Sequence, residues 1–282
     1  TTLKIHMLIL AFFSRYNMNM HYYLVSPTRI VRADASSFTY SSEERLPTGM
    51  IVAIEIGKIN AIGVVLQEVR QPDFEVKPIG KIIEEYPLPI ELVQTAIWMS
   101  KYYATHQATV WQAILPSGLS KKRRSISQST SVNPAENRTK NVFTDEQKSA
   151  LQTIENLHSG TVLLHGVTGS GKTLVYIEAV KQALKEERSA IILVPEIALT
   201  SQLVAEFSAH LPNVIVTHSK QTEAQRYVIW KRVISSNDPV VIIGPRSALF
   251  MPVQQLGLVV IDECHEPSFK QEQSPRYSAL RV

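Results

Sequence analysis

The carboxyl-terminal half of the chain alternates continuous apolar runs with stretches of helical pattern. The runs are rich in Val, Ile or Leu, and they cover residues 161–164, 190–194, 214–217, 240–243 and 258–261. Strands buried on both faces read as continuous apolar runs, and strands that alternate with helices form parallel sheets. The pattern therefore predicts an α/β fold with a parallel sheet over residues 142–282.

A different pattern fills residues 20–119. Short strands are predicted at residues 50–56 and 61–69, with a turn between them at residues 57–60. A helix is predicted to begin near Pro89, and its apolar face is formed by Leu92, Ala96, Met99 and Tyr103. We expect a small β-rich domain with a helix packed against it.

Two segments lack these patterns. Residues 120–141 are rich in Ser, Asn, Lys and Arg, which predicts a solvated linker, although its basic run at residues 121–124 could also contact phosphates. Residues 1–19 are interpreted as an extension upstream of the fold. Their apolar stretch, residues 3–13, is shorter than the ~20 residues that span a bilayer, so a membrane anchor is only the alternative.

Composition narrows the class of protein. The chain is 44% apolar and 19% charged, as globular proteins are, and its net charge of +4 is compatible with nucleic acid without proving it. The single cysteine, Cys264, excludes an internal disulfide and a Cys-rich zinc site. We therefore expect a cytoplasmic protein with no membrane partner.

The strongest chemical signal is the sequence GVTGSGKT at residues 166–173, which fits the P-loop pattern G-x-x-x-x-G-K-T between an apolar run and a helical stretch. Glycines there let backbone N–H groups surround phosphate oxygens at a helix N-terminus. Lys172 would reach the β- and γ-phosphates and Thr173 would bind Mg²⁺. The predicted nucleotide-binding residues of the loop are Gly166, Thr168, Gly169, Ser170, Gly171, Lys172 and Thr173.

A second signal follows the last apolar run, where residues 262–265 read D-E-C-H. Asp262 is predicted to hold Mg²⁺ together with Thr173, and Glu263 to polarise the attacking water, so that with Lys172 they form the catalytic set. Because D-E-x-H is typical of helicase-type ATPases, His265 is predicted to couple the phosphate site to nucleic acid. ATP and Mg²⁺ are the expected cofactors.

Weaker candidates lie at three helix starts. Before the P-loop, Phe143 is predicted to stack on adenine and Gln147 to read it. After two predicted strands, Thr200 and the pair Arg246 and Ser247 are candidates for holding a DNA phosphate. Each of these groups also has a plain interpretation as a capped helix or a strand-to-helix turn.

In combination and in order, these motifs resemble the primosomal protein N′ (PriA) family of replication-restart helicases. The matching stretches are GVTGSGKT, LVPEIALTSQL, THS, RSALF and VVIDECHEPSFKQEQSPRY, and they extend over residues 142–282. The resemblance implies a RecA-like helicase lobe 1 in an ATP-dependent 3′-to-5′ DNA helicase of primosome assembly. It also implies forked or single-stranded DNA, primosome loading proteins and single-strand-binding protein as partners.

Residues 20–119 resemble the same family's N-terminal domain, which binds the 3′ end of a nascent strand. The resemblance implies that Phe38, Tyr40, Gly57 and Lys77 line a pocket for the terminal nucleotide. Stacking of an aromatic ring on a base and pairing of a Lys with phosphate fit that role. The alternative is that these residues are ordinary core and surface positions of the β-rich domain.

Several positions depart from the family pattern. Thr39 stands where the family usually has Asp, Cys264 replaces a usual Glu, and Pro275 stands where an aromatic residue is expected. The linker is too short for the family's winged-helix domain. The second lobe, its arginine finger and the zinc-binding cysteines of the family are absent from residues 1–282, so no zinc is expected here.

We expect a fragment that binds ATP–Mg²⁺ and DNA but hydrolyses little ATP and does not unwind DNA alone. Two alternatives stay open. One is a non-catalytic DNA-binding or loading module, and the other is a P-loop enzyme that acts on small molecules.

Overall fold

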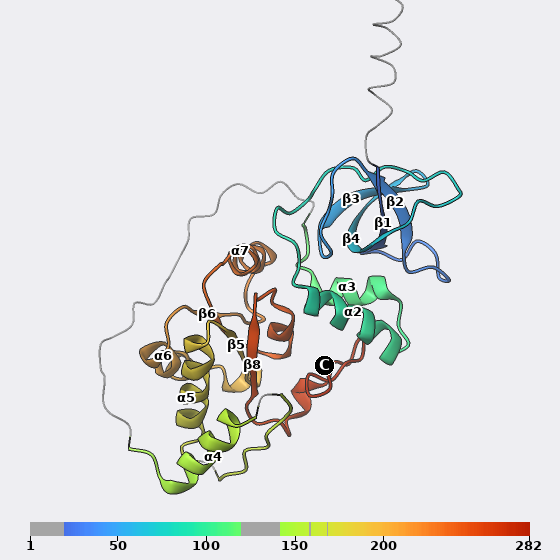
Figure 1. Ribbon diagram of the computed structural model, residues 1–282. Coiled ribbons are helices and arrows are strands. Elements are labelled where there is room, and N and C mark those ends of the chain that lie inside the picture. Colours follow the sequence, from blue (N-terminus) through green and yellow to red (C-terminus); the bar gives the residue numbers. More distant parts are fainter. Residues whose placement is uncertain (1–19, 120–141, 158, 168) are drawn as a thin grey trace, which may run out of the picture. The chain divides into compact units, whose positions relative to one another are not determined.

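The computed structural model describes residues 20–119, 142–157, 159–167 and 169–282 (Figure 1). The predictions for residues 1–19, for residues 120–141 and for Thr168 lie outside this part of the chain. The chain divides into two compact units, one of Thr1–Ile97 with His106–Thr109 and the other of Trp98–Thr105 with Val110–Val282. Among the described residues, none of the helices combines the length and the apolar character that crossing a bilayer requires.

The first unit contains a four-stranded antiparallel sheet in the order β2-β1-β4-β3. Its strands are β1 (His21–Pro27), β2 (Phe38–Ser42), β3 (Ile51–Ile56) and β4 (Ile59–Val69). Both strands predicted around the turn are confirmed, but the turn is shorter than expected because Ile56 pairs with Ile59. Gly57 has φ +61°, a conformation that glycine adopts readily and that suits the first position of a two-residue hairpin loop.

The sheet curls so that its outer strands are joined by one segment. The backbone of Ser41 in β2 pairs with Lys77 and Ile79, and the backbone of Ala53 in β3 pairs with Gly80 and Lys81. Residues 77–81 thus satisfy backbone groups on both edges, which would otherwise be left unpaired. Inside, a core cluster packs together, with Tyr23, Val25, Tyr40, Val52, Ile54 and Val65 among its buried members.

Two helices follow in the chain, α2 (Ile90–Tyr102) and α3 (Gln107–Ile114). The predicted helix is α2, and its side chains Leu92, Ala96 and Met99 are buried as the spacing indicated. Tyr103 lies just past its end. The helix α3 was not predicted, although Trp111 within it is fully buried.

The second unit contains a four-stranded parallel sheet in the order β6-β7-β5-β8. Its strands are β5 (Ser189–Leu193), β6 (Val214–Val216), β7 (Val241–Gly244) and β8 (Leu256–Ile261). The helices are α4 (Asp145–Glu155), α5 (Lys172–Lys185), α6 (Ser201–His210) and α7 (Glu223–Ile234), with 3₁₀ turns at Glu196–Ala198, Arg246–Phe250 and Pro267–Phe269. This arrangement confirms the predicted α/β fold, a RecA-like lobe preceded by a small β-rich unit.

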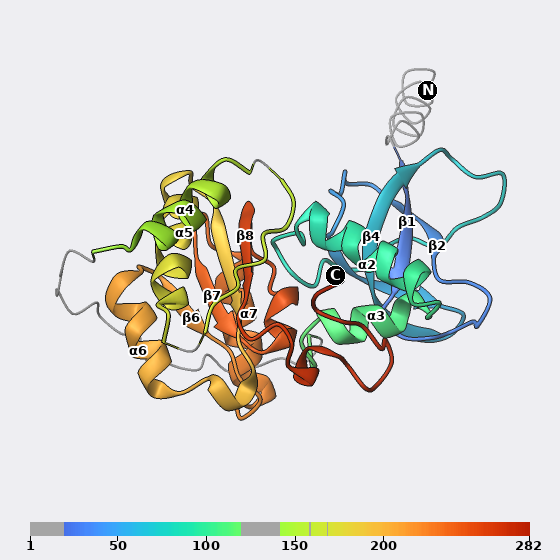
Figure 2. The same cartoon turned by 90° about the horizontal axis from the view of Figure 1, so that it is seen from below.

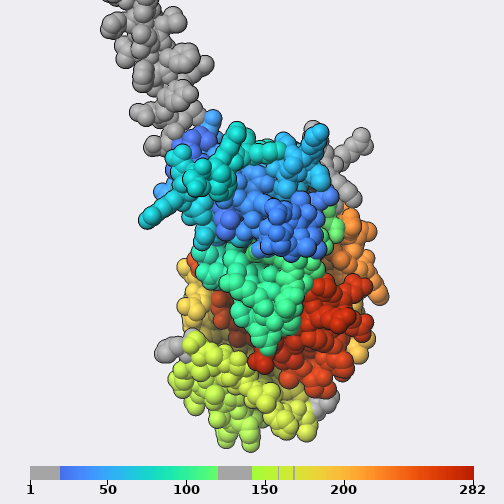
Figure 3. All heavy atoms as spheres, turned by 90° about the vertical axis from the view of Figure 1, so that its right-hand side faces the viewer, coloured from blue at the N-terminus to red at the C-terminus, as the bar shows by residue number. Residues whose placement is uncertain are grey.

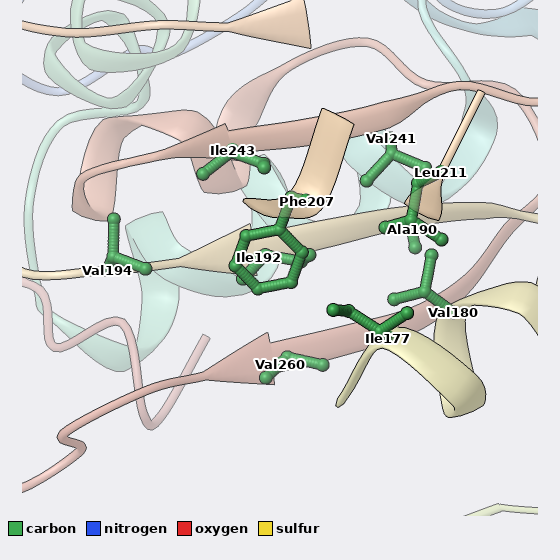
Figure 4. Packing of buried hydrophobic residues seen from close by; sticks show 10 residues of the cluster. All are labelled: Ile177, Val180, Ala190, Ile192, Val194, Phe207, Leu211, Val241, Ile243 and Val260. Atoms are coloured by element: carbon green, nitrogen blue, oxygen red, sulfur yellow. The ribbon is translucent and has the colours of Figure 1, made fainter. Parts of the chain in front are cut away.

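The inner strands β5 and β7 are buried along their whole length, as their continuous apolar runs predicted. On one face of the sheet, Ile177 and Val180 of α5 and Phe207 of α6 pack against Ile192 and Val260 (Figure 4). On the other face, a second cluster contains Ile191, Leu193, Ile242, Val233 and Phe269. Burial on both faces is what a parallel sheet requires.

One predicted strand is wrong. Residues 161–164 are not a strand, and the side chain of Leu163 is 77% exposed. A strand needs a partner for its ladder, and among the described strands β8 pairs only with β5. Residues 161–164 form no ladder with the free edge of β8, and β8 is itself partly exposed there at Leu256 and Val259.

A pair of isoleucines tests this core. Ile192 is fully buried in β5, whereas Ile197, five residues later in the same unit, is 85% exposed. We expect Ile192→Ala to lower the free energy of unfolding by about 2–5 kcal/mol, and Ile197→Ala to change it by less than about 0.5 kcal/mol. Urea unfolding followed by circular dichroism measures both, and equal losses would contradict the described packing.

Candidate functional site

The P-loop leads directly into α5, which begins at Lys172 with Gly171 as its N-cap. Gly169 and Gly171 both have φ +80°, which side-chain-bearing residues rarely adopt. A Cβ on Gly171 would lie 2.4 Å from Gln147 Nε2, and one on Gly166 would lie 2.7 Å from Ser170 Oγ. The loop thus has the tight, glycine-dependent path that exposes backbone amides at a helix N-terminus.

The Lys172 ammonium lies over this loop. Its Nζ donates to the carbonyl of Gly166 at 2.8 Å and to that of Val167 at 3.1 Å. The positive charge is therefore concentrated where the helix N-terminus also favours an anion. Contact of Lys172 with the β- and γ-phosphates stays a prediction.

The end of β8 is joined to α5 by a hydrogen bond that sequence reasoning missed. Tyr176 donates its hydroxyl to Asp262 Oδ1 at 3.3 Å, and the backbone N–H of Glu263 donates to the same oxygen at 3.0 Å. Burial and the nearby Asp262 charge raise the pKa of Tyr176 well above its usual range, so the phenol remains a donor. The available signal was spacing, because Tyr176 follows Lys172 by one helical turn.

The other two residues of the D-E-x-H motif are more open. Glu263 has φ +48°, a strained conformation for a non-glycine residue and one found preferentially at functional sites. His265 Nδ1 lies 3.6 Å from Glu263 Oε2, and the two side chains are 73% and 42% exposed. Both are reachable by a ligand, which suits their predicted roles.

The residues present fit ATP–Mg²⁺. Asp262 offers a carboxylate oxygen beyond the one bound by Tyr176, and Thr173 supplies a hydroxyl at the start of α5. Mg²⁺ prefers such oxygen ligands and is usually held by one or two carboxylates plus substrate phosphates. The described residues contain no group of three or more His, Cys, Asp or Glu side chains that could hold a metal by themselves.

Gln147 connects α4 to the P-loop, and α4 lies beside α5, the helix that follows this loop (Figure 2). Its Nε2 donates to the Ser170 carbonyl at 3.0 Å, while its Oε1 accepts from the Thr144 backbone N–H at 3.0 Å in a capping box. The interpretation of this segment as a capped helix is confirmed, with Thr144 as the N-cap, and Gln147 also lies at the loop. Phe143, next to the cap, is half-buried, and the adenine contacts of both residues stay a prediction.

The predicted DNA contacts of this unit have other partners. Thr200 accepts from the Leu203 backbone N–H at 3.2 Å and so caps α6. Arg246 donates to Gln271 Oε1 at 2.8 Å and to the carbonyl of Ser268. Its guanidinium is thereby bound to the segment after D-E-x-H, while Ser247 beside it is exposed.

The first unit contains a cavity of about 390 Å³. It is lined by Leu24, Ser37, Phe38, Thr39, Tyr40, Glu55, Ile56, Gly57, Phe74, Glu75, Val76 and Lys77. Phe38, Tyr40, Gly57 and Lys77, the residues implied by the family resemblance, are all among them. The surface of this unit is coloured blue to teal in Figure 3, and exposed Phe74 adds a third aromatic ring to the lining.

Comparison with known proteins finds a family match for each of the two units. The model of the DEAD/DEAH box helicase family matches residues 144–281, and that of the 3′DNA-binding domain (3′BD) of PriA matches residues 30–116. The replication restart protein PriA of Helicobacter pylori strain J99 is 34% identical over 261 residues, which are 92% of this chain and 40% of that protein. The chain belongs to the PriA family.

Other relatives are similar over half of the chain. PriA of Bacillus subtilis strain 168 is 44% identical over 145 residues, and PriA of a Synechocystis species is 45% identical over 143 residues; each match covers 50% of this chain. The chain spans 40% of the length of the Helicobacter protein and 18% of that of the Bacillus protein. The resemblance to PriA found in the sequence is thus confirmed.

Tyr176 offers a test of the nucleotide site. Because its hydroxyl orients Asp262, we expect Tyr176→Phe to weaken Mg²⁺-dependent binding of a fluorescent ATP analogue by roughly 3- to 30-fold, the range for one hydrogen bond to a charged group in a partly exposed site. Titration at several Mg²⁺ concentrations measures the effect. Tyr86→Phe, a change at an exposed tyrosine outside the site, is the control, and an equal effect there would contradict the assignment.

Proposed function

We propose that this chain is the ATP-binding and DNA-end-binding part of a replication-restart helicase that translocates 3′ to 5′. The observation that carries the proposal is the hydrogen bond from Tyr176 to Asp262 at 3.3 Å. It brings together the P-loop helix and the D-E-x-H strand end, which are 86 residues apart in sequence. P-loop ATPases need both motifs at one phosphate site.

In the proposed ATPase, Lys172 exchanges its two loop carbonyls for phosphate oxygens. Asp262 and Thr173 hold the metal, and the hydrogen bond from Tyr176 keeps the Asp262 carboxylate oriented. Glu263 positions the attacking water, and His265, next to it, relays the state of the site to bound DNA. When bound, Mg²⁺ neutralises charge that develops on the phosphates.

For DNA, we propose that the cavity of the first unit binds the terminal nucleotide at a 3′ end. Phe38 and Phe74 offer aromatic faces to a base, and Lys77 offers an ammonium to a phosphodiester. In the second unit, we propose that DNA phosphates are bound by backbone N–H and hydroxyl groups at three residues, Thr200, Arg246 and Ser247. By family resemblance, primosome loading proteins and single-strand-binding protein are the proposed partners, in the cytoplasm.

We further propose that this chain alone hydrolyses ATP slowly and does not unwind DNA. In related phosphoryl transferases an arginine supplied from another domain or protein accelerates the reaction by about 10³- to 10⁵-fold. The sequence of 282 residues matches only 40% of the length of the Helicobacter relative. A complete second lobe is therefore proposed to be required for unwinding.

The nucleotide half of the proposal is tested with two lysines of α5. Lys172→Ala should weaken ATP–Mg²⁺ binding by about tenfold or more because it removes a charge-assisted contact to phosphate. Lys185→Ala, at the exposed opposite end of the same helix, should leave binding unchanged. If Lys172→Ala also binds normally, the alternative of a non-catalytic DNA-binding module is favoured.

The DNA half is tested with a labelled fork whose 3′ end is free or blocked. We expect blocking to weaken binding, and Phe38→Leu, which keeps an apolar side chain but removes the aromatic face, to weaken binding of the free end by roughly tenfold. Tyr86→Leu, outside the cavity, is the control. Indifference of the protein both to blocking and to Phe38→Leu would refute recognition of the 3′ end.

A further inference from the structure

The cavity of the first unit has an unexpected charge balance for a site that binds DNA. Its charged lining side chains are Glu55, Glu75 and Lys77, two carboxylates and one ammonium. A cavity that bound only phosphate would be expected to show the opposite balance. The lining therefore favours a ligand that brings a neutral hydrogen-bond donor as well as an anionic group.

Glu55 is the lining carboxylate that pairs with Lys77. Its Oε1 accepts from Lys77 Nζ at 2.6 Å, and its backbone carbonyl accepts from the Tyr40 hydroxyl at 3.2 Å. Burial, with the Glu55 charge as a second cause, raises the pKa of Tyr40 to about 12, so this phenol stays a donor at neutral pH. The end of β3 is thus anchored while the Glu55 side chain faces the cavity.

The ion pair leaves room for a ligand. Lys77 also donates to the Gly57 carbonyl, so two of its three N–H groups are used within the described structure. The side chains of Lys77 and Glu55 are 46% and 51% exposed, which makes both groups accessible. One further N–H of Lys77 and the second carboxylate oxygen of Glu55 have no partner among the described contacts, so the cavity offers both a donor and an acceptor.

A terminal nucleotide presents the complementary pair. Its sugar carries a phosphodiester on the 5′ side and, at the end of the strand, a free 3′ hydroxyl. The phosphodiester can accept from Lys77, and the hydroxyl can donate to Glu55. A 3′ phosphate would instead bring additional negative charge against the carboxylate, and like charges in close contact repel strongly.

We propose that Glu55 is the specificity-determining residue of this cavity, which accepts a hydrogen bond from a terminal 3′ hydroxyl and rejects a terminal 3′ phosphate. This proposal rests on the proposed binding of DNA ends. Thr39, the neighbouring lining residue between Phe38 and Tyr40, carries no charge, so it cannot provide the same repulsion. Lys77 is the positioning partner that holds Glu55 toward the cavity.

The experiment compares three single-stranded oligonucleotides of one sequence, ending in a 3′ hydroxyl, a 3′ hydrogen or a 3′ phosphate. Binding to the full chain is measured by fluorescence anisotropy. We expect the hydroxyl end to bind about tenfold or more tightly than the phosphate end. In Glu55→Gln, whose amide oxygen still accepts, the phosphate end should gain affinity and the ratio should fall below about threefold.

The matched control is Glu75→Gln. It removes the same charge from the same cavity, and Glu75 is an exposed residue without an ion pair among the described contacts. We expect it to keep the wild-type ratio. Thermal unfolding of both variants checks that the fold is intact, as expected because an exposed ion pair contributes only about 0–1 kcal/mol.

The possible results distinguish a failure of the role of Glu55 from a failure of the proposed recognition of DNA ends. If the ratio is unchanged in Glu55→Gln, or falls equally in Glu75→Gln, the role of Glu55 is refuted, while weaker binding by Phe38→Leu still supports end recognition. If the wild-type chain binds the three ends equally and Phe38→Leu has no effect, end recognition is refuted and the role of Glu55 with it. A ratio that falls only in Glu55→Gln supports the proposal.

Discussion

The parallel ladder centred on β5 is the constraint on which the second unit depends. Leu193 pairs with Gly244 of β7 and with Ile261 of β8, and Val216 of β6 lies opposite Ile243. The strands therefore end at one edge of the sheet, where ligands bind in such folds. The motif segments that follow these strands in sequence all start from that edge, which brings distant parts of the chain to the proposed phosphate site.

Helix α5 completes that site because its first two turns are fixed both by packing against the sheet and by a hydrogen bond to the end of β8. Its apolar face, with Ile177 and Val180, is buried against the sheet, and its first turn carries the P-loop lysine. Tyr176, on the adjacent face, then reaches Asp262. The packing of α5 against the sheet thus sets the position of Lys172 and Tyr176 relative to Asp262, on which the proposed binding of phosphate and metal depends.

In the first unit, the main constraint is that both edges of a small antiparallel sheet must find hydrogen-bond partners. Residues 77–81 pair with both β2 and β3, and the Tyr40 hydroxyl joins the same two strands. Closure brings Phe38 from one edge and Glu55 from the other to a single cavity. The charges of Glu55 and Lys77 meet there for the same reason.

Local sequence determined the features that need only neighbouring residues. The P-loop and its helix, the capping box of Thr144 and Gln147, and the hairpin at Gly57 all follow from φ preferences and hydrogen bonds within a few residues. Tertiary structure alone decided that residues 161–164 stay outside the sheet, that Arg246 binds the segment after D-E-x-H, and that Tyr176 meets Asp262 and Glu55 meets Lys77. Those outcomes depend on which strand edges and side chains come together in the folded chain. The spacing of residues along the sequence does not determine this, because the partners are far apart in sequence.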